Sequence, residues 1–315
     1  MSNLPSSDVV CIFCSDIHLS HKAPPFRSSE KNWYDAMARP MNELRQLQKK
    51  HDCPIVIAGD IFDKWNVPAE LINFAIDVLP KNCYAIPGQH DLPYHNIADI
   101  ERTAFWTLVK AGKITYLEKP YLIYNELIML HPFPWGAELQ PLSNKAKRIT
   151  GKAITNIAVV HKYVWMKGFN YPGAPKENTM VLLKQKLRGF NLAVFGDNHK
   201  GFAYFIHPNT QFPNIVNCGT FMIRKSDEQD YQPSVWLVKS NDTFNRHLLD
   251  TSEDIYDENA TPGLDTDPED MIDFVKGITE FQKMTKDFRA GVLQWMEKHK
   301  NLPGSVKAIL MDALE

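Results

Sequence analysis

The sequence predicts an α/β (α+β) protein built around β-sheets, and three observations lead to this class. Short apolar runs alternate with helix-like patterns over the first two-thirds of the 315 residues, as in domains whose sheets are covered by helices. Beyond Lys200 the pattern becomes rich in strands. The composition, 44% hydrophobic and 23% charged, supplies the core and the solvated surface of an ordinary globular protein.

The expected elements follow one another in a regular order. Apolar runs bounded by turn residues predict strands at 8–15, 54–59, 83–88, 122–130, 156–161, 190–196, 202–207, 214–223 and 234–239. Helical patterns between them predict helices at 35–50, 68–79 and 180–188. Together these elements predict one large domain over residues 1–250.

The end of the chain differs from this large domain. Residues 251–268, TSEDIYDENATPGLDTDP, are acidic, polar and proline-bearing, which predicts an exposed linker. Residues 269–315 are expected to form a helical tail. Its apolar residues recur at steps of three and four and give one apolar stripe: Phe281, Met284, Phe288, Val292 and Trp295.

Composition argues against several classes of protein. No apolar run approaches membrane-spanning length, and the start, MSNLPSSDVV, lacks the parts of a signal peptide, so we expect a cytoplasmic protein without a membrane partner. Five cysteines show no disulfide framework, and Cys11 and Cys14 face opposite ways from an apolar strand, which suits core packing. A net charge of −2 gives no global basic field for nucleic acid.

Polar residues that can bind metal follow five of the predicted strands. Loops at the carboxyl ends of strands are where α/β folds place their sites, because a rigid sheet holds them in register. In the last loop one residue separates Asp197 from His199. Side chains two positions apart point the same way from an extended backbone. Each motif is common alone, but five in succession predict a metal centre. The groups are Asp16 to His18, Asp60 to Asp63, Gln89 to Asp91, His161, and Asp197 to His199.

This order of motifs resembles the calcineurin-like metallophosphoesterase superfamily, whose pattern is D-x-H, G-D-x-x-D, G-N-H-[DE], H and G-H-x-H. The resemblance covers residues 9–222 and implies a four-layer αββα metallophosphoesterase sandwich, with residues 1–250 as the catalytic domain. It also implies two divalent metal ions, about 3.5 to 4 Å apart, that share one ligand. One ion would be held by Asp16, His18, Asp60 and His199, and the other by Asp60, Gln89, His161 and Asp197.

The same resemblance assigns residues around the metals. His90 is expected to protonate the leaving oxygen or to stabilise its charge, and Asp63 to orient the His90 imidazole through a hydrogen bond. Asp91 is expected to anchor its loop and not to touch substrate. Substrate contacts are expected from His21, Lys162, Trp165 and Lys200.

Two positions depart from the family pattern, and both belong to the second metal. Gln89 stands where asparagine is usual, and Asp197 stands where the first histidine of G-H-x-H is usual. An amide oxygen and a carboxylate make the site harder and more anionic, which favours manganese, with magnesium, zinc and iron as the other ions to consider. In the other interpretation Asp197 is only a turn residue, and the second metal is loose or absent.

Within the superfamily, three segments are similar to the SbcD-type DNA repair nucleases. They are IAGDIFDKWNVP at 57–68, LHPFPWG at 130–136 and NCGTFMIRKSDE at 217–228. This resemblance implies DNA as the substrate and an exonuclease or endonuclease activity. It also implies an SMC-like ATPase partner of the SbcC type and allows a homodimer.

The loop after His161, KYVWMKGFNYPGAPK, interleaves lysines with aromatic residues. Basic side chains can follow phosphates while rings stack on unpaired bases, and ordinary packing within the loop is the equal alternative. Two other functions stay open. One is a phosphodiesterase or phosphatase for a small molecule such as a nucleotide, and the other is a metal-poor DNA-binding subunit that serves an ATPase.

Overall fold

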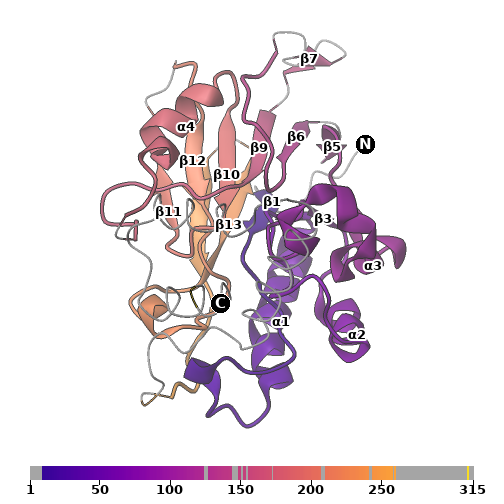
Figure 1. Cartoon of the computed structure of the whole chain (residues 1–315). Coiled ribbons are helices and arrows are strands. Elements are labelled where there is room, and N and C mark those ends of the chain that lie inside the picture. The colour runs from indigo at the N-terminus through magenta and orange to yellow at the C-terminus, as the bar shows by residue number, and fades with distance from the viewer. Residues whose placement is uncertain are drawn as a thin grey trace. The chain divides into compact units, whose positions relative to one another are not determined.

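The computed structural model of the chain describes residues 9–123, 127–143, 148–149, 152–153, 155–171, 173–206, 210–240, 243–257, 259 and 311. Nearly all of these belong to one compact unit, Met1–Pro262, and the fold given below is that of this unit (Figure 1). The second unit is Gly263–Glu315. The predicted helical tail at 269–315 lies outside the described residues, apart from Met311.

The first of two large sheets has six strands. Its strands β1 to β4 are parallel, because a helical or irregular crossover separates each from the next. Two later strands extend one edge as antiparallel neighbours. In order across the sheet the strands are β14 (Phe244–Leu248), β13 (Ser234–Lys239), β1 (Val9–Cys14), β2 (Ile55–Ile57), β3 (Cys83–Ala85) and β4 (Ile114–Tyr116).

The second sheet also has six strands and a parallel centre. An antiparallel strand closes each edge. The order is β11 (Phe202–Tyr204), β12 (Asn214–Asn217), β10 (Leu192–Gly196), β9 (Thr155–His161), β6 (Ile128–Phe133) and β5 (Tyr121–Ile123). A separate short pair consists of β7 (Arg148–Ile149) and β8 (Lys152–Ala153).

Helix α1 (Trp33–His51) begins and ends where side chains and backbone supply caps. The Asn32 side chain accepts hydrogen bonds from the backbone N–H groups of Tyr34 and Asp35, and Asp52 ends the helix in a left-handed conformation. The other α-helices of the described residues are α2 (Ala69–Val78), α3 (Ala104–Lys110) and α4 (Met180–Lys186). None of the helices in this part of the chain is long and apolar enough to cross a membrane.

Three hydrophobic cores separate the layers of the unit. Alternate side chains of β1 face opposite sides of the first sheet, so Ile12 packs in the core beneath α1 to α3 and Phe13 packs between the two sheets. In the third core Val160 of β9 packs with Leu183 of α4. Figure 1 shows α1 to α3 (purple) gathered together and α4 (pink) beside the second sheet. The layers are therefore helices, sheet, sheet and helix, and the predicted αββα sandwich is confirmed.

The structure differs from the predicted elements where those elements are short. The strand predicted at 122–130 is divided into β5 and β6. The strand predicted at 214–223 ends at Asn217, before Gly219 turns the chain with a φ of 78°. Elements α3, β4 and β14 have no counterpart in the prediction, because such short runs carry too little periodicity to identify.

The start of the expected linker packs within the compact unit Met1–Pro262. Asp254 pairs with the buried guanidinium of Arg27 at 2.9 Å, and the ring of Tyr256 stacks on that of Phe26 with centroids 5.2 Å apart. At Asp254 and Tyr256 the expected linker therefore makes side-chain contacts, while Ile255 between them is exposed. The acidic pattern of this segment gave no sign of a buried arginine partner far away in the chain.

The cysteines lie in the cores, as expected. Cys11 packs between the sheets and Cys14 packs beneath the helices, so the two face opposite ways from β1. All five cysteines are buried and free. The C-x-x-C spacing here reflects core packing and not a zinc or redox pair.

Candidate metal centre

The loops that carry the predicted ligands leave the carboxyl ends of parallel strands in both sheets. Hydrogen bonds between the loops fix their register. The N–H of Asp16 donates to the carbonyl of Gly59 at 3.1 Å, and the N–H of His18 donates to the carbonyl of Asp60 at 3.0 Å. The N–H of Asp197 donates to the Asp16 carboxylate at 3.1 Å and so ties the two sheets together.

Four predicted ligands have a left-handed backbone that residues with side chains rarely adopt. The φ angle is 52° at Asp16, 49° at His18, 54° at Asp60 and 84° at Asp197. Such a conformation costs on the order of 1–3 kcal/mol and persists only where surrounding contacts enforce it. Strain of this kind is concentrated at functional sites. Here it falls on residues that the motifs had singled out.

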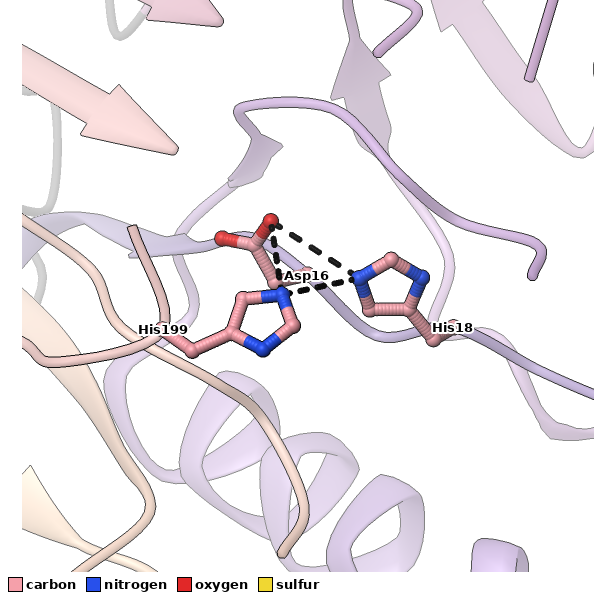
Figure 2. Close-up of side chains that lie close together, drawn as sticks. All are labelled: Asp16, His18 and His199. Atoms are coloured by element: carbon pink, nitrogen blue, oxygen red, sulfur yellow. Dashed lines mark hydrogen bonds and ion pairs between the residues drawn. The ribbon is translucent and has the colours of Figure 1, made fainter. Parts of the chain in front are cut away.

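The first group of candidate ligands contains Asp16, His18 and His199 (Figure 2). The three side chains point toward one another from loops that lie far apart in the sequence. Nε2 of His18 lies 3.2 Å from Nε2 of His199, and each Nε2 lies 3.9 Å from Oδ1 of Asp16. One carboxylate oxygen and two imidazole nitrogens therefore converge on a small volume.

The second group is a continuous chain of contacts. Oδ2 of Asp60 lies 3.3 Å from Nε2 of His161. The same nitrogen lies 2.7 Å from Oε1 of Gln89. The Gln89 amide N–H then donates to Oδ1 of Asp197 at 3.0 Å. The structure thus brings together all four residues predicted for the second metal, and their role as ligands stays a prediction.

Divalent ions fit these residues. Asp16 and Asp60 are fully buried carboxylates. Oδ1 of Asp60 accepts a hydrogen bond from the backbone N–H of His90 at 3.0 Å, whereas Oδ2 is buried without a hydrogen-bond partner among the described residues. A buried anionic oxygen without a hydrogen bond needs positive charge beside it, which protonated His161 supplies in the metal-free protein and which a divalent ion would supply in its place. Oxygen and imidazole donors are the set that divalent transition metals take.

The charged groups of the centre shift one another's protonation. Burial raises the pKa of Asp16 to about 6. Burial opposes the charge on His161, but Asp60 outweighs it and raises the pKa of His161 to about 10. Burial likewise opposes the charge on His199, and Glu228 raises the pKa of that ring to about 9. In the metal-free centre the rings of His161 and His199 are therefore protonated. Bound metal ions would replace the protons on these rings and supply the positive charge instead.

Oxygen partners hold the outer nitrogens of two candidate ligands. Nδ1 of His161 donates to the carbonyl of Ala58 at 2.6 Å, and Nδ1 of His199 donates to Oε1 of Glu228 at 2.5 Å. Nε2 of each ring is thereby left to face the centre, as in metal-binding histidines. Gly59 leaves the space that His161 needs, because a Cβ there would lie 2.0 Å from Nδ1.

His90 lies beside the centre and is held by the main chain. Its Nδ1 donates to the backbone carbonyl of Asp63 at 2.8 Å. The Asp63 carboxylate instead accepts from Nη2 of Arg224 at 2.6 Å and lies 3.7 Å from Nδ1 of His18. The contact expected between Asp63 and His90 is therefore present, but it runs through the carbonyl and not through the carboxylate, because Arg224 holds the latter.

Asp91 is fully buried and binds backbone only. Its carboxylate accepts hydrogen bonds from the N–H groups of Gly88 at 3.0 Å, Phe62 at 3.1 Å and Ile61 at 3.3 Å. These contacts tie the loop after β3 to the loop after β2. Asp91 therefore occupies the place of a loop anchor.

The four residues predicted to contact substrate lie in different surroundings. Lys162 and Lys200 each follow a candidate ligand, the first half-buried and the second exposed. Trp165 is half-buried and donates its indole N–H to a backbone carbonyl of its own loop at 2.8 Å. His21 is exposed, and its Nδ1 lies 2.9 Å from the hydroxyl of Tyr34.

The prediction omits Arg224 and Glu228, of which Glu228 contacts the candidate ligand His199 and Arg224 contacts Asp63. Glu228 accepts from His199 and also from the backbone N–H of Arg224, at 2.7 Å. Both residues lie in the segment 217–228, whose resemblance to the nuclease pattern was the available signal. Nothing in that pattern tells which of its charged residues turn inward.

Comparison with known proteins identifies one family model that matches this chain. The family model for calcineurin-like phosphoesterases matches residues 10–201. A search of curated proteins gives no match. One solved chain is 11% identical with a TM-score of 0.44, and the match covers 76% of this chain and 98% of that one. Sulfate thiohydrolase SoxB of Thermus thermophilus, in complex with glycerol, is 10% identical with a TM-score of 0.46, and the match covers 82% of this chain and 60% of that one. Likenesses this distant carry no argument about activity.

Proposed function

The chain belongs to the calcineurin-like phosphoesterase family, and we propose that it is a metal-dependent phosphodiester hydrolase that cleaves DNA. One observation carries this proposal. Oδ2 of Asp60 lies between the two groups of candidate ligands, 3.8 Å from Nε2 of His18 and 3.3 Å from Nε2 of His161. A carboxylate in this position can be shared by two ions, which is the arrangement that clamps a phosphodiester.

The chain's own residues would hold both ions and the reacting groups. In the reaction the oxygen of water bonds to phosphorus and loses a proton to the solvent, the bond from phosphorus to the leaving oxygen breaks, and the leaving oxygen gains a proton from the protein, which solvent then replaces. Bound divalent ions supply Lewis acidity toward the phosphoryl oxygens and lower the pKa of water. The residues proposed as ligands are Asp16, His18, Asp60 and His199 for one ion, and Asp60, Gln89, His161 and Asp197 for the other.

We propose that His90 donates the proton that the leaving oxygen receives. Its Nδ1–H is donated to the carbonyl of Asp63, so Nε2 is the nitrogen that can give up a proton. The ring lies 4.8 Å from the ring of His18, and its backbone N–H binds Asp60. The proposed acid is therefore held next to the carboxylate that both ions would share.

Manganese is the ion that we propose. The candidate ligands include the carboxylates of Asp16, Asp60 and Asp197 and the amide oxygen of Gln89, beside three imidazoles. An oxygen-rich set of this kind suits manganese or magnesium better than zinc.

DNA is the substrate class that we propose, on the resemblance to SbcD-type nucleases and on the loop after His161. In this loop the rings of Tyr163 and Tyr171 lie 4.9 Å apart, and Tyr171 is 49% exposed. Lys162 and Lys167 flank Tyr163 in the sequence. Exposed rings can stack on unpaired bases while lysines follow phosphates. An SMC-like ATPase partner belongs to the same proposal.

Hydrolysis assays on linear DNA and on a cyclic nucleotide, each with manganese and with EDTA, test the proposal. We expect manganese-dependent cleavage of DNA that EDTA abolishes. Cleavage of the cyclic nucleotide alone would replace DNA with a small-molecule substrate. Binding of DNA without hydrolysis of either substrate would indicate a DNA-binding subunit. Circular single-stranded DNA, added as a further substrate, separates endonuclease from exonuclease.

A further inference from the structure

A buried arginine lies against the metal centre without being one of its candidate ligands. The side chain of Arg224 is 7% exposed, and its Nη2 donates to Oδ1 of Asp63 at 2.6 Å. The backbone N–H of Arg224 donates to Oε2 of Glu228 at 2.7 Å. The side chain and the main chain of one residue thus serve two different partners.

The Asp63 carboxylate depends on this arginine. Burial opposes the charge on Asp63, and Arg224 outweighs burial and holds the pKa of Asp63 below its ordinary value. A carboxylate that loses its charged partner in such a place must find another donor. Nδ1 of His18 lies 3.7 Å away and has no hydrogen-bond partner among the described residues. Without Arg224 the carboxylate would turn toward His18, and Asp63 would lose its side-chain anchor while it keeps the hydrogen bond from its backbone N–H to the carbonyl of Leu19 at 3.0 Å.

We propose that Arg224 is a positioning residue for His90 and that it acts through Asp63. Asp63 presents its carboxylate to Arg224 and its backbone carbonyl to Nδ1 of His90. The ion pair therefore fixes the carbonyl that sets the direction and the tautomer of the His90 ring. A general acid must stay within hydrogen-bond reach of the leaving oxygen, so movement of this carbonyl impairs protonation of the leaving group. The inference rests on the proposed function, in which His90 supplies that proton.

Among the described residues the side chain of Arg224 donates a hydrogen bond to Asp63 and to none of the candidate ligands. Glu228 orients the candidate ligand His199, and the part of Arg224 that holds Glu228 is the backbone N–H. A substitution of the side chain keeps that N–H. Arg224→Gln removes a positive charge that acts on His18 and His199 but keeps the N–H that holds Glu228, so both manganese sites should remain while acid catalysis weakens.

Two phosphodiesters distinguish acid catalysis from other losses. A dinucleotide releases an alkoxide that needs a proton, whereas bis(p-nitrophenyl) phosphate releases a stable phenolate that needs little help. We expect Arg224→Gln to lower kcat on the dinucleotide by about ten- to hundredfold, the range for residues that orient others. KM on the dinucleotide and turnover of the activated ester should change little. Arg224→Lys, which keeps the charge, should restore part of the loss.

A double variant tests the route from Arg224 to His90. If Arg224 acts through His90, then Arg224→Gln combined with His90→Ala is no slower on the dinucleotide than His90→Ala alone. Arg246→Gln is the matched control, because Arg246 lies on the edge strand β14 and donates to Oγ of Ser234 at 2.8 Å. This variant should behave as the wild type on both esters.

Several results would overturn the inference. Equal losses of Arg224→Gln on both esters would do so, as would losses that multiply in the double variant. Loss of a manganese site, measured by calorimetric titration, would show that Arg224 serves the ligands instead. If Arg224→Gln fails to fold, Asp63→Asn removes the same ion pair, keeps the carbonyl and must give the same pattern. A wild-type protein that hydrolyses neither ester would reject the proposed function itself.

Discussion

Asp197 is the candidate ligand at which the centre departs most from the pattern of its family. Its Oδ1 accepts from the Gln89 amide at 3.0 Å, and its N–H donates to Asp16. The two unusual residues of the second group therefore contact each other. An aspartate here can accept from the longer glutamine side chain, which gives a physical reason for the two departures to occur together.

Asp197→Asn should weaken the binding of one manganese ion and spare the other, because His199 belongs to the first group. The expected loss of affinity is about ten- to hundredfold. Asp197→His should shift preference toward zinc, since imidazole suits softer ions better than carboxylate does. Calorimetric titration of both variants with manganese and zinc measures this. If Asp197→Asn binds both manganese ions as tightly as the wild type, then Asp197 is a turn residue and not a ligand.

Binding of manganese at pH 7 should release about two protons, because ligand imidazoles must be neutral. The pKa of His161 is raised to about 10 and that of His199 to about 9, so both rings are charged in the metal-free protein at this pH. Manganese affinity should rise as the pH approaches 9. Calorimetry in two buffers of different ionisation enthalpy counts the protons. A binding heat that is the same in both buffers would contradict the expectation.

The same pKa shifts make the stability of the metal-free protein fall as the pH rises, whereas manganese affinity rises. A raised folded-state pKa contributes stability that is fully present below the ordinary value of 6.5 and is lost as the pH rises through about 9 for His199. Glu228→Gln provides a control, because Glu228 is the group that raises this pKa. That variant should release fewer protons on binding manganese.

At the scale of elements, the positions of the residues that follow strands could be predicted from the sequence. The distant residues with which their side chains pair could not. Asp60 follows an apolar strand, and parallel pairing carries every such strand end to one edge of its sheet, so its place could be inferred. The partner of Asp63 is 161 residues away, and the partner of Arg27 is 227 residues away. No local periodicity encodes such pairs. For the same reason the motif identified Asp63 but not the choice between its carbonyl and its carboxylate.

The turn after β2 gives a prediction at this scale. Gly59 has a φ of 100°, and a Cβ there would meet His161 at 2.0 Å. Gly112 has a φ of 67° and open space around it. Gly112→Ala should therefore cost only the backbone strain of a left-handed residue, about 1–2 kcal/mol in the free energy of unfolding. Gly59→Ala should cost more and should weaken manganese binding, because His161 must move. Equal costs, with manganese affinity unchanged, would show that the turn does not position His161.

At the scale of the whole chain, a buried cluster ties the end of the catalytic unit to its beginning. Arg27 is 1% exposed and donates to the carbonyl of Ile223 at 2.8 Å and to Asp254 at 3.0 Å. Ile223 directly precedes Arg224. The segment after β14 is thereby joined to the residues that border the metal centre.

Two truncations test the importance of this cluster. A chain that ends after Pro262 keeps Asp254 and every candidate ligand, so it should fold and retain manganese-dependent hydrolysis of simple phosphodiesters. A chain that ends after Asp250 removes a partner of the buried Arg27, which should cost about 3 kcal/mol in the free energy of unfolding. Thermal and denaturant unfolding measure the difference. Equal stability of the two chains would show that the cluster is dispensable.

The central claim is that a metal centre sharing Asp60 hydrolyses phosphodiester bonds in DNA. Cleavage of an end-labelled linear DNA, followed as manganese is added to metal-free protein, tests it most directly when wild type and Asp60→Asn are measured side by side. We predict that wild-type cleavage rises from none to saturation with manganese, and that Asp60→Asn loses at least a hundredfold, about the scale on which functional groups in such sites contribute. Cleavage without manganese, or an Asp60→Asn protein as active as the wild type, would contradict the claim.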